Sequence, residues 1–156
     1  MNIIDDVVNS WRLNNAIHLY LLDRLSENDL VKKLNNKGKS IASQFGHIHN
    51  IRVLWLKTSS GNPMESQATK LEKDSLDKHL LIQSLSRSSE AVMILLTNGF
   101  NNNKIKNTSL NPVLFYTYLV AHENHHRGQI ISTMKNNAIP IDKSVYFDIW
   151  EWKKFL

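Results

Sequence analysis

The chain has 156 residues, 19 Lys or Arg against 14 Asp or Glu, a formal net charge of +5, and no cysteine. We expect residues 1–156 to form a single domain, because this length can bury a core without covalent cross-links. The missing cysteines exclude disulfides, thiolate nucleophiles and cysteine-based zinc sites. The basic residues occur as scattered pairs without interleaved aromatic residues, so we do not expect a nucleic-acid partner.

The first residues, MNIIDDVVNSW, do not resemble a secretory signal, because Asp5 and Asp6 stand where such a signal has basic residues and then a long apolar run. No apolar stretch approaches the length that a bilayer requires. The lack of cysteine agrees with a reducing compartment. We therefore expect a cytoplasmic protein without a membrane partner.

Helical periodicity runs through most of the chain, and it predicts a first helix over residues 3–25. Its apolar stripe consists of Ile4, Val8, Trp11, Leu19 and Leu22. The polar segment 26–39 separates this helix from a second one. Ser40 is the expected N-cap of the second helix, which should reach about residue 58.

Turn residues mark the next boundaries. Gly61-Asn62-Pro63 indicates a loop, Asp74 is the expected N-cap of a third helix, and Asn98-Gly99 is its expected end. The buried stripe of this helix is Leu81, Leu85, Val92 and Leu95.

The run of asparagines at 101–103 is typical of a loop. Asn111 and Pro112 then read as the cap and first residue of a fourth helix that extends to about Asn137. A short fifth helix is expected over 144–154. Its segment is rich in aromatic residues, which we expect to pack back on the protein: Tyr146, Phe147, Trp150, Trp152 and Phe155.

No segment alternates with period two over a convincing length, so strands are not expected. Four long amphipathic helices joined by moderate loops predict an all-α fold, a four-helix bundle with a short extra C-terminal helix. Such bundles often build metal sites from side chains on facing helices.

The histidines carry the functional signal. His122 and His126 are one helical turn apart, about 40° in rotation, and share an apolar stripe, whereas His125 is rotated by about 100° from His126. Two imidazoles on one buried face are costly to desolvate without a shared partner. A shared metal ion and a pair of core histidines bonded to polar neighbours both explain the pair.

A third metal ligand has to come from another helix. His47 and His49 are candidates on the second helix, and only one can serve, because side chains two apart point in nearly opposite directions. Both flank the apolar stripe; His47 shares its side with Ile51, which favours it slightly. His18 and His79 are most simply explained as solvated side chains.

Two motifs together resemble the DinB/YfiT-like family of metalloenzymes. The first is Ser40-Ile41, His47-Ile48 and Trp55, and the second is His122-x-x-x-His126-Arg127-Gly128-Gln129. The resemblance covers most of the chain, including the tail from Ile139 to Trp150. Where that family often has an acidic residue between the first histidine and the tryptophan, this chain has Arg52, which puts a carboxylate role there in question.

The resemblance implies a bundle of up-down-down-up type that holds a divalent metal on His47, His122 and His126, with water in the open positions. It thereby chooses His47 over His49 and His126 over His125. It also implies a homodimer and a small-molecule substrate. Some relatives transfer a low-molecular-weight thiol to an electrophile, and others resemble metal-dependent hydrolases.

Imidazole ligands suit zinc, nickel, copper or iron, and the sequence does not choose among them. We expect zinc or nickel, with iron or manganese as alternatives, and three neutral imidazoles leave the ion an open coordination position. The nucleophile is then water or an external thiol, because the chain has no cysteine. Arg127 would orient an anionic group or form a structural salt bridge, and Gln129 would hydrogen-bond near the metal or between helices.

We thus expect a metal-dependent thiol S-transferase or hydrolase of the stress response, with a non-catalytic, stress-related metal-binding bundle as the alternative. A remote alternative follows from the literal H-E-x-x-H at residues 122–126, in which Glu123 would be the base of a metalloprotease and Glu151 the acidic third ligand. Glu123 is offset by about 100° from His122, so a solvated or salt-bridged role suits it better.

Overall fold

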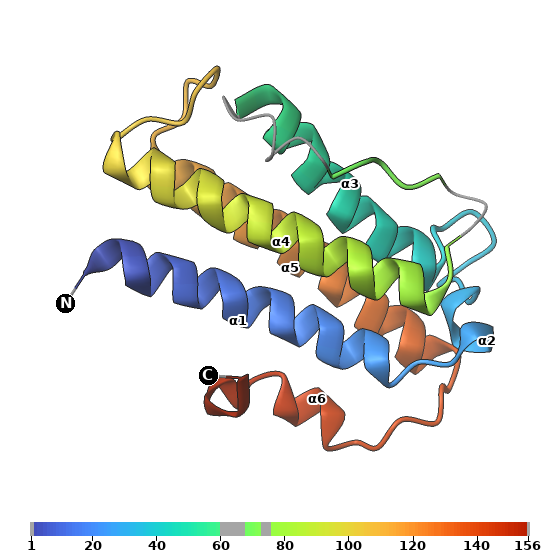
Figure 1. The fold of residues 1–156 in the computed structure, drawn as a ribbon. Helices are drawn as coiled ribbons and strands as arrows, with labels where there is room; N and C mark the ends of the chain where they lie inside the picture. The colour runs from blue at the N-terminus through green and yellow to red at the C-terminus, as the bar shows by residue number, and fades with distance from the viewer. Residues whose placement is uncertain (1, 60–67, 73–75, 156) are drawn as a thin grey trace.

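The computed structural model describes residues 2–59, 68–72 and 76–155 (Figure 1). Four long helices dominate it: α1 (Ile3–Asp23), α3 (Ile41–Ser59), α4 (Lys78–Asn101) and α5 (Pro112–Asn136). Three short segments complete it: α2 (Glu27–Leu30), α6 (Val145–Asp148) and the 3₁₀ turn η2 (Trp152–Phe155). The described ranges contain no strand, only an isolated bridge between Lys33 and Ser40, so the all-α prediction is confirmed.

The helices run up, down, down and up, as Figure 1 shows for α1, α3, α4 and α5 in turn. Helices α1 and α3 each pack against both α4 and α5. Because α3 and α4 run in the same direction, the chain between them must return along the bundle. Asn50 holds part of this return segment, since its side chain bonds both the backbone N–H and the carbonyl of Leu71 (2.8 and 2.9 Å). None of the helices formed by the described residues is long and apolar enough to cross a membrane.

Side-chain caps start two of the long helices where the polar residues predict, and a third helix starts at a cap that was not predicted. Ser40 accepts the backbone N–H of Ser43 at the start of α3 (3.1 Å), and Asn111 accepts that of Leu114 at the start of α5 (2.9 Å), with Pro112 in the first turn. Helix α4 begins after Asp77, whose carboxylate accepts the N–H of Leu80. The predicted cap at Asp74 and the predicted loop at 61–63 lie outside the described residues.

The predicted end of α4 at Asn98-Gly99 is wrong, because the helix continues to Asn101. Gly99 serves packing instead. A Cβ atom at Gly99 would lie 2.3 Å from Cδ1 of Ile105, so the absence of a side chain lets the following loop close onto the helix. The turn itself is made by Asn103, whose φ of 49° is left-handed.

The C-terminal segment also differs from expectation, since it forms α6 and η2 rather than one helix. Phe147, Trp150 and Trp152 are 70%, 75% and 54% exposed, so the expectation that the aromatic tail packs back on the bundle is wrong for them. It holds for Tyr146 and Phe155, which pack against the core.

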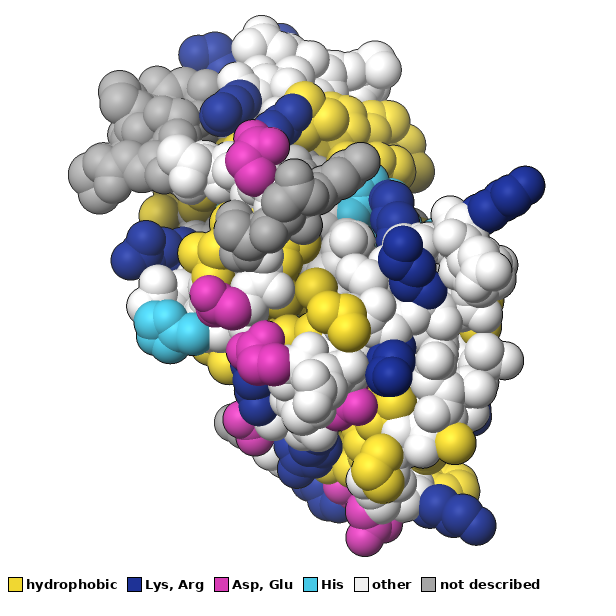
Figure 2. Space-filling view, turned by 90° about the vertical axis from the view of Figure 1, so that its right-hand side faces the viewer, with side chains coloured by type: hydrophobic (Ala, Val, Ile, Leu, Met, Phe, Trp, Pro, Cys, Tyr) yellow, Lys and Arg dark blue, Asp and Glu magenta, His cyan; other side chains and the backbone are white. Residues whose placement is uncertain are grey.

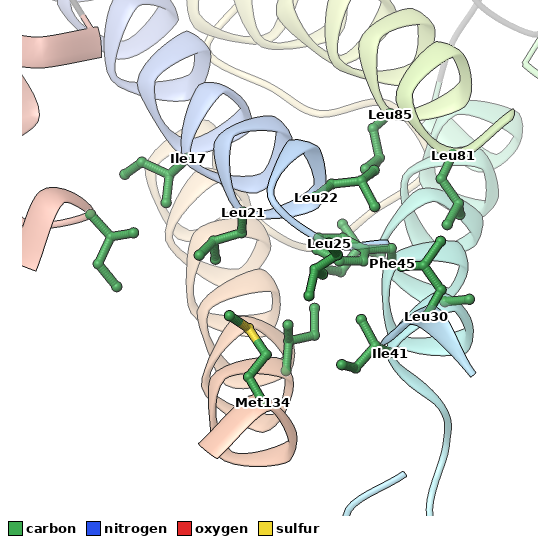
Figure 3. Packing of buried hydrophobic residues seen from close by; sticks show 14 of the residues in the cluster. Ile17, Leu21, Leu22, Leu25, Leu30, Ile41, Phe45, Leu81, Leu85 and Met134 are labelled. Carbon is green, nitrogen blue, oxygen red and sulfur yellow. The ribbon is translucent and has the colours of Figure 1, made fainter. Parts of the chain in front are cut away.

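Two apolar clusters fill the interior, and a buried polar layer separates them. Figure 3 shows the larger cluster, in which side chains from α1, α3, α4 and α5 meet, among them Leu21, Phe45, Leu85 and Met134. The smaller cluster surrounds Trp11, Val92, Phe115 and Leu119. Along α3, α4 and α5 the polar layer falls between the two clusters, and on α1 its residues alternate with members of the larger cluster. The layer consists of Asn14, Asn15, His18, Arg52, Ser88 and Glu123.

Candidate metal centre

Helices α3 and α5 bring His47, His122 and His126 together. One ring nitrogen of each lies within 4.8 Å of the others, a spacing at which the three could hold one ion. The ring centroids of His47 and His126 are 4.5 Å apart, those of His122 and His126 4.6 Å, and those of His47 and His122 5.4 Å. His126 is buried and the other two are partly buried, so the cluster opens toward solvent.

All three imidazoles are neutral at pH 7. Burial is the main cause, and it lowers the pKa of His47 and of His126 to about 4, helped by the neighbouring histidines and Lys39. Burial also lowers the pKa of His122. Neutral imidazoles offer lone pairs to a cation, which is the protonation state that a metal ligand needs.

The hydrogen bonds of the three histidines are compatible with metal binding. Nδ1 of His126 donates to the side-chain oxygen of Gln44 at 2.6 Å, so the lone pair of His126 is on Nε2. Nδ1 of His122 is buried and has no hydrogen-bond partner among the described residues. An unpartnered buried nitrogen is costly, and three neutral imidazoles are a donor set that a divalent transition metal accepts.

The other histidines are engaged elsewhere or exposed. His49 points to the far side of α3, where its ring nitrogens lie 2.9 Å from the carbonyl oxygen of Ser84 and 2.8 Å from that of Thr69. His125 is exposed, and its Nε2 is 2.9 Å from the amide nitrogen of Gln129 on the next turn. Gln129 therefore bonds within α5, not between helices. His79 is exposed, as expected.

The family model that matches this chain is that of the DinB family, over residues 1–137. The chain belongs to the DinB family. The match includes all four long helices and the three clustered histidines, and it ends before the tail from Ile139 to Trp150 that the resemblance includes. Neither curated proteins nor solved structures gave a match to this DinB protein.

The glutamate next to His122 points away from the histidine cluster into the polar layer. Glu123 accepts hydrogen bonds from Nε and Nη2 of Arg52 (2.6 and 2.8 Å), from Nδ2 of Asn14 (2.6 Å) and from Nε2 of His18 (3.1 Å). Burial alone would raise the pKa of Glu123, but the charge and hydrogen bonds of Arg52 outweigh it and lower that pKa to about 2. Glu123 is thus the salt-bridged residue that its offset predicts.

In this arrangement neither the general base nor the acidic third ligand of a metalloprotease is available. A general base has to reach the metal-bound nucleophile, and both oxygens of Glu123 are bonded in the core. Glu151, the acidic candidate ligand, is exposed at the C-terminus and pairs with Lys154 (2.9 Å). The HExxH pattern at residues 122–126 therefore arises by chance and does not indicate a metalloprotease.

The expectation that His18 is solvated is wrong. His18 is 0% exposed, and burial lowers its pKa to about 4 despite the contact with Glu123. Its position carried the signal, since it lies seven residues after Trp11 and four before Leu22, on the buried face of α1. Arg52 was likewise missed, although it stands four residues before the buried Leu56.

Arg127 does not form the structural salt bridge that is one of its two expected roles, and the orientation of an anionic group stays a prediction. Its guanidinium donates to the side-chain oxygens of Asn14 (3.0 Å) and Asn124. These are neutral partners, and among the described residues no ion pair involves Arg127. Arg127 therefore links α5 to α1 beside the polar layer.

Two different walls flank the histidine cluster. On one side, Tyr118 stacks on His122 with ring centroids 5.9 Å apart, and Trp55 meets Tyr118 edge-on at 5.6 Å. On the other side, a cavity of about 350 Å³ reaches His126; it is lined by Leu34, Asn35, Gly38, Lys39, Gln44, His126, Gln129 and Thr133. Figure 2 shows one face of the protein, on which a group of hydrophobic side chains lies near Lys or Arg side chains.

Proposed function

We propose that this DinB protein binds one divalent metal ion through His47, His122 and His126, and that it acts on an electrophilic small molecule. The observation that supports the proposal is the convergence of three neutral imidazoles at a partly open site. Zinc or nickel is the expected ion, with iron or manganese as alternatives.

The residues around the cluster have separate roles in this proposal. Gln44 fixes the tautomer and ring orientation of His126, and Tyr118 limits the approach of solvent to His122. When bound, the ion supplies positive charge that lowers the pKa of a coordinated water or thiol. The partly exposed rings of His47 and His122 leave room for a substrate.

We place thiol transfer before hydrolysis because of the resemblance to thiol-transferring relatives. In transfer, an external thiol loses its proton to solvent, its sulfur bonds to the electrophilic carbon, and the leaving group departs with the bonding electron pair. In hydrolysis, the oxygen of water takes the place of the sulfur. The chain itself has no cysteine to supply the sulfur.

Metal analysis of protein purified without a histidine tag tests the metal centre. Wild type should carry one ion per chain, and His47→Ala, His122→Ala and His126→Ala should each lose it. His125→Ala is the matched control on α5 and should keep the ion, as should His49→Ala. Retention of the ion by His47→Ala would contradict the proposed third ligand.

Mass spectrometry of the same samples tests the reaction. Protein is incubated with a panel of electrophiles, with and without glutathione or bacillithiol. A conjugate that requires both the metal and His126 supports transfer, whereas a hydrolysis product without added thiol supports hydrolysis. If neither product forms while the metal stays bound, the result favours the alternative function, a non-catalytic, stress-related metal-binding bundle.

We also infer a homodimer, on the family resemblance and on the exposed aromatic side chains Phe147, Trp150 and Trp152. Sedimentation velocity at micromolar concentration should show a species of twice the chain mass. A strictly monomeric species would remove the inference. A small-molecule substrate in the cytoplasm remains part of the proposal.

A further inference from the structure

We propose that the cavity beside His126 binds a carboxylate group of the substrate or of the thiol cofactor, with Lys39 as the residue that recognises it. This inference rests on the proposed function for what happens at the histidines, and it adds the chemical class of the molecule that reaches them.

The cavity is placed and sized for a small molecule. It lies between the segment that follows α2 and the facing sides of α3 and α5, and it shares His126 with the metal centre. Its volume of about 350 Å³ is near the lower end of the range for small-molecule sites, roughly 300–1,000 Å³. A molecule bound there has one end at the candidate metal ligand.

Asn35, Gln44 and Lys39 have donor groups to offer among the side chains that line the cavity, whereas Gln129 and Thr133 use their donors within α5. The side-chain oxygen of Asn35 accepts the backbone N–H of Lys37 (3.1 Å), and that of Gln44 accepts Nδ1–H of His126 (2.6 Å). The remaining polar group of each side chain is therefore its NH₂. Lys39 adds an ammonium group, which has only donors.

Charge also favours an anion. Lys39 is the charged residue among the described lining residues, and none of these is acidic. Two amide donors and an ammonium next to a cationic centre match the two oxygens of a carboxylate.

Calorimetric titration of the full chain with succinate, and with neutral succinamide as the matched probe, tests the cavity. Metal-free and zinc-loaded protein are both titrated. Succinate should bind wild type in both states, and Lys39→Gln should weaken it by about tenfold, while Lys39→Arg should retain most of the affinity. Lys37→Gln is the matched control, because Lys37 is exposed but does not line the cavity.

Unchanged succinate affinity in Lys39→Gln would overturn the proposal, as would equal binding of succinamide. Failure of the proposed function is separate, since protein that takes up no metal can still be titrated with succinate. Kinetics identify the source of the carboxylate. If Lys39→Gln raises the KM for glutathione but not for cysteamine, the carboxylate belongs to the thiol. If it raises the KM for iodoacetate but not for iodoacetamide, the carboxylate belongs to the electrophile. An unchanged KM in both comparisons contradicts the proposal.

Discussion

The guanidinium of Arg52 and the carboxylate of Glu123 form a bidentate ion pair in the centre of the bundle, with N–O distances of 2.6 and 2.8 Å. Glu123 is next to His122 on α5, and Arg52 lies five residues after His47 on α3. The pair therefore fixes the rotation and register of the two helices that present the histidines. A further bond from Arg52 to the carbonyl of Leu85 (2.9 Å) ties α4 to the same point.

Removal of one member of this pair should destabilise the fold strongly. Arg52→Met leaves the carboxylate of Glu123 buried without its cation, and the free energy of unfolding should fall by about 3–5 kcal/mol. Urea unfolding measures the change. The double variant Arg52→Met/Glu123→Leu should recover much of the loss, because it leaves no unpaired charge. A double variant no more stable than Arg52→Met would contradict this account.

Gln44 should act on metal affinity rather than on metal stoichiometry. Gln44→Leu removes the acceptor for Nδ1–H of His126, so the ring loses its fixed tautomer, and metal affinity should fall by roughly 10- to 100-fold. Competition with a chromogenic chelator measures the affinity. Gln129→Leu is the matched control, since Gln129 bonds His125 and not a proposed ligand. Equal affinities of the two variants would remove the role given to Gln44.

Acid should destabilise the metal-free protein, partly through His18. Burial lowers the pKa of His18 from 6.5 to about 4. Between these values the unfolded chain binds a proton that the folded protein excludes, so the free energy of unfolding decreases as the pH falls from 6.5 toward 4. The contribution of His18 between pH 7 and pH 5 is about 2 kcal/mol. Glu123 adds little in this range, because most of its effect falls between pH 4.5 and about 2.

Urea unfolding at pH 7 and pH 5 checks the acid effect. His18→Gln should show a smaller loss of stability between the two pH values than wild type, whatever its stability at pH 7. His79→Gln serves as the control, because His79 is exposed and should leave the difference unchanged. The same pH dependence in wild type and His18→Gln would show that His18 is not the titrating group.

Two glycines in helices should respond in opposite directions to alanine. Gly99→Ala places a Cβ atom 2.3 Å from Cδ1 of Ile105 and should destabilise the protein by about 1–3 kcal/mol. Gly128→Ala meets nothing within 4 Å and should stabilise it by roughly 0.5–1 kcal/mol through helix propensity. Thermal unfolding of both variants gives the comparison. Destabilisation by Gly128→Ala would indicate a contact that this bundle does not show.

Local sequence signals determined where α3 and α5 begin. Ser40, Asn111 and Pro112 mark starts that depend on a few neighbouring residues, because a cap satisfies backbone N–H groups within one turn. The one-turn spacing of His122 and His126 likewise put both rings on one face before any packing was known. The position of Gly99 misled the prediction of the end of α4, because its role is a contact with Ile105 across the loop.

Only the tertiary structure decided which polar side chains meet. Spacing on α3 did not separate His47 from His49, and the resemblance chose His47. In the fold, His47 joins His122 and His126, whereas the carbonyls of Ser84 and Thr69 engage His49. The pairing of Arg52 with Glu123 was likewise not predictable from the sequence. A charge buried in a helix is tolerated only when a partner from another helix neutralises it, and the identity of that partner depends on how the helices assemble.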